Sequence, residues 1–195
     1  MTTPPPSNAT PKRVNRYVWL DLETTGLNPR KGYLLECYTR VTNVAWEPLG
    51  EYHALLDVPQ QEAWAAMDDY VRNMHTKNGL LEDLRTKPTL NRNAFARELT
   101  AFLREHKTNG ERLYLAGNTI NFDRAWLEVF APQAVEELYH RNLDVSSTRV
   151  QMEARTGEDW HFPKKKGHRA KDDVDESIAE HDFLWDKYDA WVLSR

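Results

Sequence analysis

The segment Tyr17-Val-Trp-Leu-Asp-Leu-Glu-Thr-Thr-Gly-Leu27 joins an apolar run, two acids one residue apart and a turn. The apolar run predicts a buried strand, and a strand directs residues i and i+2 to the same face. Asp21 and Glu23 should therefore point into one small space, where like charges repel unless a proton or a cation intervenes. An oxygen-only ligand set favours Mg²⁺ or Mn²⁺ over zinc. An edge strand with two solvated acids is the alternative, and this pattern alone does not exclude it.

The segments that follow predict a mixed sheet flanked by helices. Aromatic and β-branched content predicts strands over 17–22, 33–46 and 49–58, close enough in sequence to form an antiparallel meander. Apolar residues at helical spacing predict helices over 60–66, 68–77, 80–85, 91–106, 123–129, 146–155 and 171–191. Short strands over 112–116 and 143–145 alternate with the later helices. This order of elements is typical of an α/β protein with helices packed on its sheet.

Two local predictions concern helix ends and faces. Asn91 stands where the longer helix before residue 106 should begin, so it is the expected N-cap. In the last helix, Val174, Ile178, Trp185 and Tyr188 are expected to mark one buried face.

Length and composition indicate one soluble globular domain. The chain has 195 residues, 40% of them hydrophobic and 29% charged, and no apolar run approaches the roughly 18 residues of a membrane span. Residues 1–15 are rich in proline and predict a disordered leader before a single domain over 16–195. Cys37 is the single cysteine, which fits a reducing compartment, and the cytoplasm is the expected location.

The charge pattern limits the kind of nucleic-acid partner. A formal net charge of −4 argues against a protein that coats long nucleic acid through phosphate contacts alone. A short nucleic-acid substrate remains open. Basic stretches occur at 11–16 and 164–171, but each taken alone is typical of a solvated loop.

Two further acids stand where they could join the first pair. Asp123 is expected near the start of a helix that follows a strand, and Asp173 in the first turn of the last helix. Taken singly, either acid could serve only the helix macrodipole. The combination is more specific: Asp-x-Glu closing a first strand, an Asp after a central strand, and His168 five residues before Asp173.

In that order, the acids and the histidine resemble the DEDDh family of 3′-to-5′ exonucleases, and within it the oligoribonucleases. The resemblance spans about residues 16–190 and includes the segments 66–80, 143–146 and 170–173. It implies a ribonuclease H-like fold, with a mixed five-stranded sheet whose first three strands are antiparallel. It also implies hydrolysis of di- to pentanucleotides of RNA to nucleoside 5′-monophosphates.

The resemblance further implies which residues bind metal and which residue acts as the general base. Two divalent cations, Mg²⁺ or Mn²⁺, are expected on Asp21, Glu23, Asp123 and Asp173. Two such ions can stabilise an in-line displacement at phosphorus. His168 is expected to take a proton from the attacking water as general base.

The expected substrate contacts lie on several segments and have structural alternatives. Leu27 corresponds to an apolar wedge against a base, and Tyr70 to an aromatic that stacks on a base. A core aromatic is the alternative for Tyr70, and a surface arginine for Arg141. The remaining predicted substrate-binding residues are His75, which contacts the substrate, and Thr119, Arg141 and Ser146, which hold its 5′ phosphate. In that family the arginine reaches across from a second subunit, which implies a homodimer.

Departures from the family pattern leave other functions open. Thr24, Phe122 and His140 replace the family's usual residues, and the second strand carries Leu35-Glu-Cys-Tyr-Thr39 instead of aliphatic residues. One alternative is an exonuclease of broader specificity, acting on single-stranded DNA or longer RNA 3′ ends. Another is a catalytically silent module that only binds nucleic acid.

Overall fold

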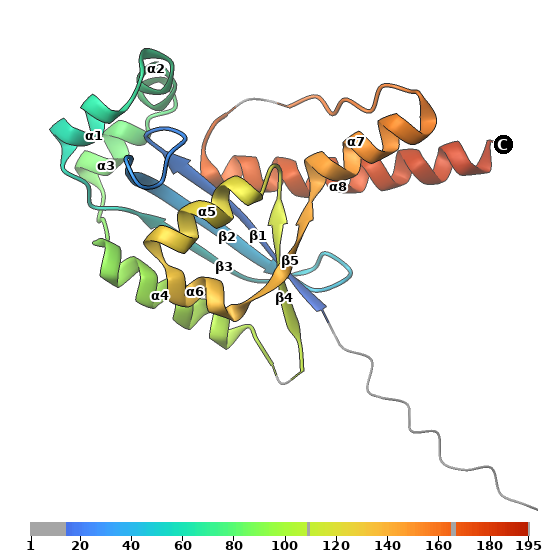
Figure 1. Cartoon of the computed structure of the whole chain (residues 1–195), viewed down its shortest axis with the longest axis horizontal. Coiled ribbons are helices and arrows are strands. Elements are labelled where there is room, and N and C mark those ends of the chain that lie inside the picture. Colours follow the sequence, from blue (N-terminus) through green and yellow to red (C-terminus); the bar gives the residue numbers. More distant parts are fainter. Residues whose placement is uncertain (1–14, 109, 165–166, 195) are drawn as a thin grey trace, which may run out of the picture.

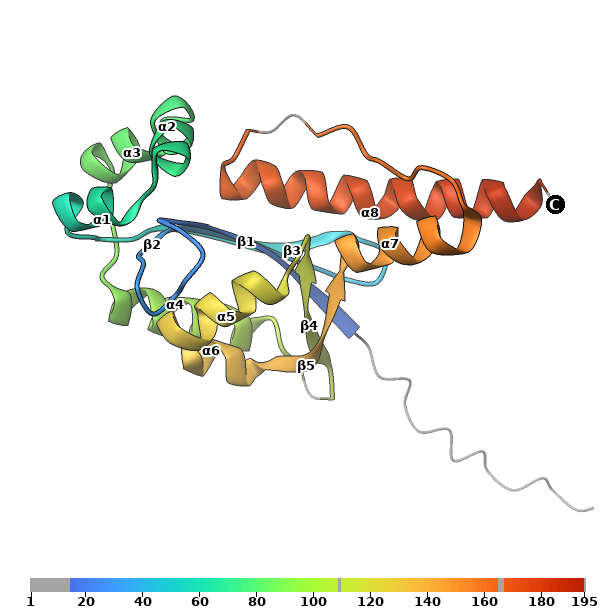
Figure 2. The ribbon, with the colours of Figure 1, turned by 45° about the horizontal axis from the view of Figure 1, so that its top comes forward.

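A computed structural model describes residues 15–108, 110–164 and 167–194 of the chain. One sheet lies between two layers of helices, as Figures 1 and 2 show. The predicted leader falls almost wholly outside the described residues, as do Lys165 and Lys166 of the second basic stretch.

The sheet has five strands, and its topology is mixed. They are β1 (Asn15–Thr24), β2 (Leu34–Thr42), β3 (Pro48–Leu55), β4 (Arg112–Gly117) and β5 (Leu138–Asp144), in the spatial order β3-β2-β1-β4-β5. β1 and β3 each pair antiparallel with β2. β4 pairs parallel with both β1 and β5. The predicted mixed sheet, with its first three strands antiparallel, is therefore confirmed.

Two strands, β2 and β5, differ most from their predicted ends. β2 ends at Thr42 rather than at residue 46, because the Asn43 side chain accepts hydrogen bonds from the backbone N–H groups of Ala45 and Glu47. These bonds close a turn before β3. β5 begins at Leu138 rather than at residue 143, and its first half is too polar to be recognised as a strand.

Eight helices complete the described fold. They are α1 (Gln60–Ala66), α2 (Asp69–Lys77), α3 (Leu80–Thr86), α4 (Arg92–Glu105), α5 (Asn121–Phe130), α6 (Pro132–Glu137), α7 (Val145–Thr156) and α8 (Ala170–Leu193). The predicted Asn91 cap is confirmed, since its Oδ1 accepts the Ala94 N–H at 2.9 Å. The sequence did not predict α6, a short helix with proline in its first turn. None of the helices in the described ranges is both long and apolar enough to cross a membrane.

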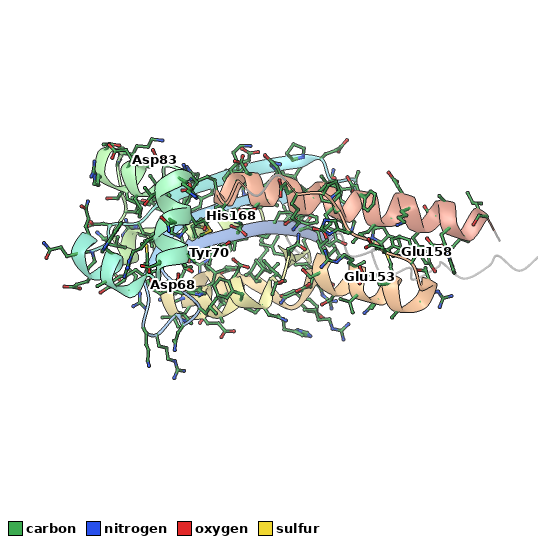
Figure 3. The ribbon with its side chains drawn as sticks, turned by 90° about the horizontal axis from the view of Figure 1, so that it is seen from above. Asp68, Tyr70, Asp83, Glu153, Glu158 and His168 are labelled. Carbon is green, nitrogen blue, oxygen red and sulfur yellow. The ribbon has the colours of Figure 1, made fainter. Side chains whose placement is uncertain are left out.

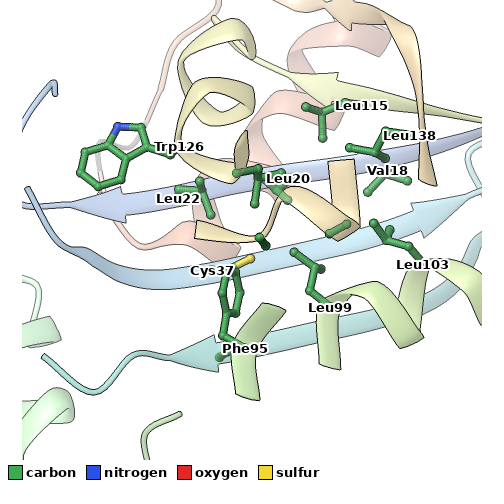
Figure 4. Close-up of a cluster of buried hydrophobic side chains, with 14 of the residues drawn as sticks. Val18, Leu20, Leu22, Cys37, Phe95, Leu99, Leu103, Leu115, Trp126 and Leu138 are labelled. Carbon is green, nitrogen blue, oxygen red and sulfur yellow. The ribbon is translucent and has the colours of Figure 1, made fainter. Parts of the chain in front are cut away.

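The main core lies between the sheet and the helices α4, α5 and α6. Val18, Leu20 and Leu22 alternate along β1 and all face this side, which is the period of two that a strand imposes. Phe95 of α4 and Trp126 of α5 close the other side of the cluster, shown in Figure 4. Since the even positions of β1 take this face, its odd positions turn to the opposite one.

The opposite face of the sheet is covered by α8. Trp19 of β1 and Val174 and Leu184 of α8 belong to one buried cluster there. The prediction that Trp185 lies on the buried face of α8 is wrong, because 46% of its surface is exposed. The C-terminal half of α8 runs past the edge of the sheet (Figure 2), and Trp185 packs on His181 instead, donating to its Nε2 at 3.1 Å.

Candidate metal centre

Three carboxylates gather on the face of the sheet that α8 covers. Asp21 and Glu23 come from β1, and Asp173 lies in the first turn of α8. One oxygen from each lies within 4.8 Å of the other two. No other group of three His, Cys, Asp or Glu side chains in the described ranges shows this spacing. The period of β1 and the docking of α8 together create the cluster.

The fourth predicted ligand, Asp123, lies near the point where the pairing of β1 with β4 ends. The last parallel pair is Trp19 with Ala116, so the Leu22 N–H lies beyond the end of that ladder. Asp123 Oδ1 accepts this N–H at 3.0 Å, and its side chain is buried in the first turn of α5. Asp123 therefore stands next to the three-carboxylate cluster, with one oxygen already held by the backbone.

Burial raises the pKa values of all four carboxyl groups. The pKa of Glu23 is raised to about 9, that of Asp123 to about 8 and that of Asp173 to about 6, in each case mainly by burial. The pKa of Asp21 lies well above its usual range because of burial and the nearby charges of Asp123 and Glu23. Like charges held in a partly desolvated space account for this pattern.

These residues fit a divalent cation. Ionising several of these acids together is unfavourable unless positive charge lies among them, and a bound cation supplies that charge. All the donor atoms are carboxylate oxygens, the ligands that Mg²⁺ and Mn²⁺ prefer over zinc.

His168 lies beside this cluster, just before α8. Its charge lowers the pKa of Asp173, although burial of Asp173 has the larger, opposite effect. The backbone of His168 is in the left-handed region, with φ of 49°, and its carbonyl accepts a hydrogen bond from the Asn78 side chain. That conformation is uncommon for a residue other than glycine, and it persists only where neighbours fix it.

A cavity of about 470 Å³ opens between α2 and the His168 segment. Its lining comes from two segments and comprises Tyr70, Asn73, Met74, Lys77, Asn78, Gly167 and His168. Figure 3 shows Tyr70 of α2 next to His168. Tyr70 is 69% exposed, so the alternative of a core aromatic does not hold. Leu27, in the loop after β1, is 87% exposed.

His75 is placed differently from the other predicted substrate contacts, because it is fully buried. Its Nε2 hydrogen-bonds the Thr24 carbonyl at 3.0 Å, and its Nδ1 lies 3.9 Å from Glu23 Oε2. Burial lowers the pKa of His75. The His75 side chain thus fixes the position of the C-terminal end of β1 through its contacts with Thr24 and Glu23.

Of the three residues predicted to hold a 5′ phosphate, the structure brings two together. The Thr119 N–H donates to Ser146 Oγ at 3.2 Å, and Ser146 Oγ donates to Asn118 Oδ1 at 2.9 Å. Thr119 also has a left-handed backbone, with φ of 52°. Arg141 lies on β5 with its side chain exposed.

A further acid near this centre, Glu36 of β2, was not among the predicted site residues. It is paired in register with Glu23 and is 2% exposed. Burial alone would raise its pKa, but hydrogen bonds from His53 and Arg169 lower the pKa to about 2. A charged residue inside the apolar run of 34–42 was the available signal for it.

Comparison with known protein sequences finds relatives that are oligoribonucleases. No family model matches the chain. It is 35% identical over 182 residues to an oligoribonuclease of Corynebacterium glutamicum (strain R), covering 91% of this chain and 83% of that protein. An oligoribonuclease of Tropheryma whipplei (strain Twist) is 39% identical over 168 residues, covering 84% and 88%. The mitochondrial oligoribonuclease of Bos taurus is 32% identical over 170 residues, covering 86% and 71%.

Similar solved structures include exonuclease I. The enzyme from Methylocaldum szegediense has a TM-score of 0.58 at 16% identity over 86% of this chain. The E. coli enzyme in complex with a dT13 oligonucleotide has a TM-score of 0.57 at 15% identity over the same share. The chain spans only about two fifths of these proteins, 39% and 40%. At such identity the likeness shows the fold alone, and it confirms the expected ribonuclease H-like class.

Proposed function

The chain belongs to the oligoribonuclease family of 3′-to-5′ exonucleases, and on that premise we propose that it hydrolyses short oligoribonucleotides to nucleoside 5′-monophosphates. The proposed substrates are single-stranded di- to pentanucleotides. The free, buried thiol of Cys37 fits a reducing compartment, and we propose the cytoplasm.

One observation carries the proposal. Oxygens of Asp21, Glu23 and Asp173 lie within 4.8 Å of one another, and His168, whose charge acts on Asp173, also lines an open cavity. Asp123 adds a fourth carboxylate at the same end of β1. Such a site offers the charge and the proton acceptor that hydrolysis of a phosphodiester requires.

The proposed mechanism divides the work between metal and protein. Asp21, Glu23, Asp123 and Asp173 would hold two divalent cations, which would supply Lewis-acid stabilisation of the charge at the scissile phosphate. His168 accepts a proton from the attacking water at an imidazole nitrogen, and the nearby Asp173 carboxylate stabilises the imidazolium that forms. His75 acts through Thr24 and Glu23, by keeping the end of β1 in place beneath the substrate.

The exposed apolar side chains are proposed to bind the bases. Tyr70 offers an aromatic face in the cavity next to His168, and aromatic faces stack on any base. Leu27 is exposed just past the end of β1, where it can pack as a wedge against the base next to the cleaved bond.

The 5′ end of a short RNA is proposed to bind at Thr119 and Ser146. The Thr119 and Ser146 hydroxyl oxygens lie 3.2 Å apart there, and hydroxyl groups are common partners of phosphate. Arg141 of a second subunit is proposed to complete the site in a homodimer. A closed site of this kind would limit the length of the substrate.

A length series of 5′-labelled oligomers, from dinucleotides to twenty-mers in RNA and DNA, tests the proposal. We expect Mn²⁺-dependent release of nucleoside 5′-monophosphates from the 3′ end, and a rate that falls steeply beyond five nucleotides. EDTA should abolish the reaction, because the carboxylate cluster has no activity without its cations.

The same series separates the alternatives. A flat length profile, or equal rates on DNA, would contradict the short-RNA preference and favour a broader exonuclease. Binding without hydrolysis at every length would instead indicate a silent nucleic-acid-binding module.

Replacement of Tyr70 tests the base-stacking role. Stacking on an aromatic is worth about 1–3 kcal/mol per base, so Tyr70→Ala should raise KM by roughly 10-fold or more while kcat stays within about 3-fold. Tyr70→Trp should keep KM at or below the original value, since the larger ring stacks at least as well.

Trp64→Ala is the matched control for Tyr70. Trp64 is also an exposed aromatic, but it lies on α1 outside the cavity that contains His168. Steady-state kinetics on a dinucleotide should show no change in KM for this variant. An equal rise in KM for both variants would remove Tyr70 from the proposed site.

A further inference from the structure

A buried ion pair holds the segment that carries His168. Glu36 of β2 receives the Arg169 guanidinium through two hydrogen bonds, Nε to Oε2 at 3.0 Å and Nη2 to Oε1 at 2.9 Å. Glu36 Oε2 also accepts the backbone N–H of Ala170 at 3.3 Å, and His53 Nε2 lies 2.8 Å from Oε1. Both carboxylate oxygens are thus engaged, which sets Glu36 apart from the metal-binding acids beside it.

Arg169 connects this carboxylate to α2 and α3 as well. Its Nη2 also donates to Asp83 Oδ2 at 2.9 Å, and its Nη1 to the Asn78 carbonyl at 3.4 Å. The Asn78 side chain in turn donates to the carbonyl of His168. Arg169 follows His168 directly in the chain and occupies the N-cap position of α8. The backbone of His168 is therefore held by its own carbonyl and by the next side chain.

We propose that Glu36 and Arg169 are positioning residues for His168. The pair keeps the His168 backbone in its left-handed conformation and so directs the imidazole to the carboxylate cluster. A bidentate arginine–carboxylate pair suits this role because it fixes orientation as well as distance. The inference rests on the proposed function of His168 as general base.

Removing the pair should slow the reaction without weakening binding. A misplacement of about 1 Å at a catalytic group can reduce the rate about 100-fold. Arg169→Gln and Glu36→Gln are therefore expected to lower kcat by about 10- to 100-fold at saturating Mn²⁺, with KM for the substrate unchanged. Two variants are used because Glu36 is the more deeply buried partner, and Arg169→Gln alone still tests the pair if Glu36→Gln is unstable.

A double-mutant cycle with His168→Ala shows whether the pair acts through the base. If it does, Arg169→Gln should cause no further loss once His168 is already alanine, because its effect passes through the missing imidazole. If the double variant instead lost activity by the product of the two single losses, the proposal would be overturned. It would also be overturned if Arg169→Gln lowered kcat while His168→Ala did not.

Arg40→Gln is the matched control. Arg40 also joins β2 to α8, with Nη1 2.6 Å from Asp175 Oδ1, but it does not contact the His168 segment. We expect its kcat to stay within about 2-fold of the original and its melting temperature to fall as much as that of Arg169→Gln. An equal loss of kcat in both variants would mean that loosening β2 from α8 is the cause, and would overturn the proposal.

Two readouts keep this inference separate from the proposed substrate. The cycle is run on a dinucleotide and on thymidine 5′-monophosphate p-nitrophenyl ester. If the protein cleaves only the ester, the proposed RNA substrate is wrong, but the ester still tests the role of the Glu36–Arg169 pair. The His168 imidazole resonance, followed by NMR, should shift in Arg169→Gln and not in Arg40→Gln. An unchanged resonance in Arg169→Gln would overturn the proposal even if the protein cleaved neither compound.

Discussion

Asp21→Asn is expected to lower hydrolysis by at least about 10³-fold, since a metal centre of this kind contributes several kcal/mol to the transition state. Asp21 is one of the three acids whose oxygens converge, and an amide there removes a negative charge from the proposed metal site. The same change should raise the melting temperature of the metal-free protein, because the repulsion among Asp21, Asp123 and Glu23 is reduced. Activity and stability should thus move in opposite directions.

The measurements are turnover of a labelled dinucleotide with Mn²⁺ and a thermal melt in EDTA. Asp186→Asn, on an exposed stretch of α8, is the control, and it should change neither quantity. A variant that retains more than about a tenth of its turnover would contradict the assignment of Asp21 as a metal ligand. A lower melting temperature in EDTA would contradict the repulsion inferred for the cluster.

The metal-free protein should lose stability as pH rises from about 5 to 9. The folded-state pKa values of Glu23, Asp123 and Asp173 are about 9, 8 and 6, all above their values in an unfolded chain. The folded protein therefore holds protons that the unfolded chain releases, so this stabilisation is complete at low pH and is lost as pH rises through those values. Glu36, with its pKa lowered to about 2, has the opposite dependence, but below this window.

The expected fall in melting temperature over this window is on the order of 10 °C, from a loss of several kcal/mol in a domain of this size. Saturating Mn²⁺ should flatten the dependence, because a cation that binds only the folded state replaces the protons. Melts followed by circular dichroism in EDTA and in Mn²⁺ provide the check. A melting temperature independent of pH in EDTA would show that the four acids do not repel one another in the folded protein.

Features set by residues a few positions apart in one strand or helix could be predicted from the sequence. Asp21 and Glu23 share a face because strand residues alternate, and the prediction needed no knowledge of the fold. Asn91 caps the start of α4 by accepting a hydrogen bond from the N–H of Ala94, three positions away. Patterns over a few neighbouring residues also predicted that Asp123 and Asp173 lie near the starts of helices, and both lie in first turns.

The parts that depend on distant segments could not be predicted in this way. The bond from Arg169 to Glu36 joins positions 133 residues apart, and neither residue carries a local signal of its partner. Trp185 satisfied the period of α8 but is 46% exposed, whereas its neighbour Leu184 is fully buried, so the period alone gave the wrong face. The exposure of Tyr70 likewise depends on how α2 sits beside the His168 segment, which helical spacing does not specify.

The cluster draws its acids from the first strand and the last helix of the described chain. A cation bound there links elements near the two ends of the described chain, so it closes a loop that contains most of the fold. A partly synthesised chain that contains only β1, β4 and α5 lacks Asp173. The metal centre is completed only when α8 packs on β1. During translation, nuclease activity should therefore arise late and all at once, after the rest of the sheet has formed.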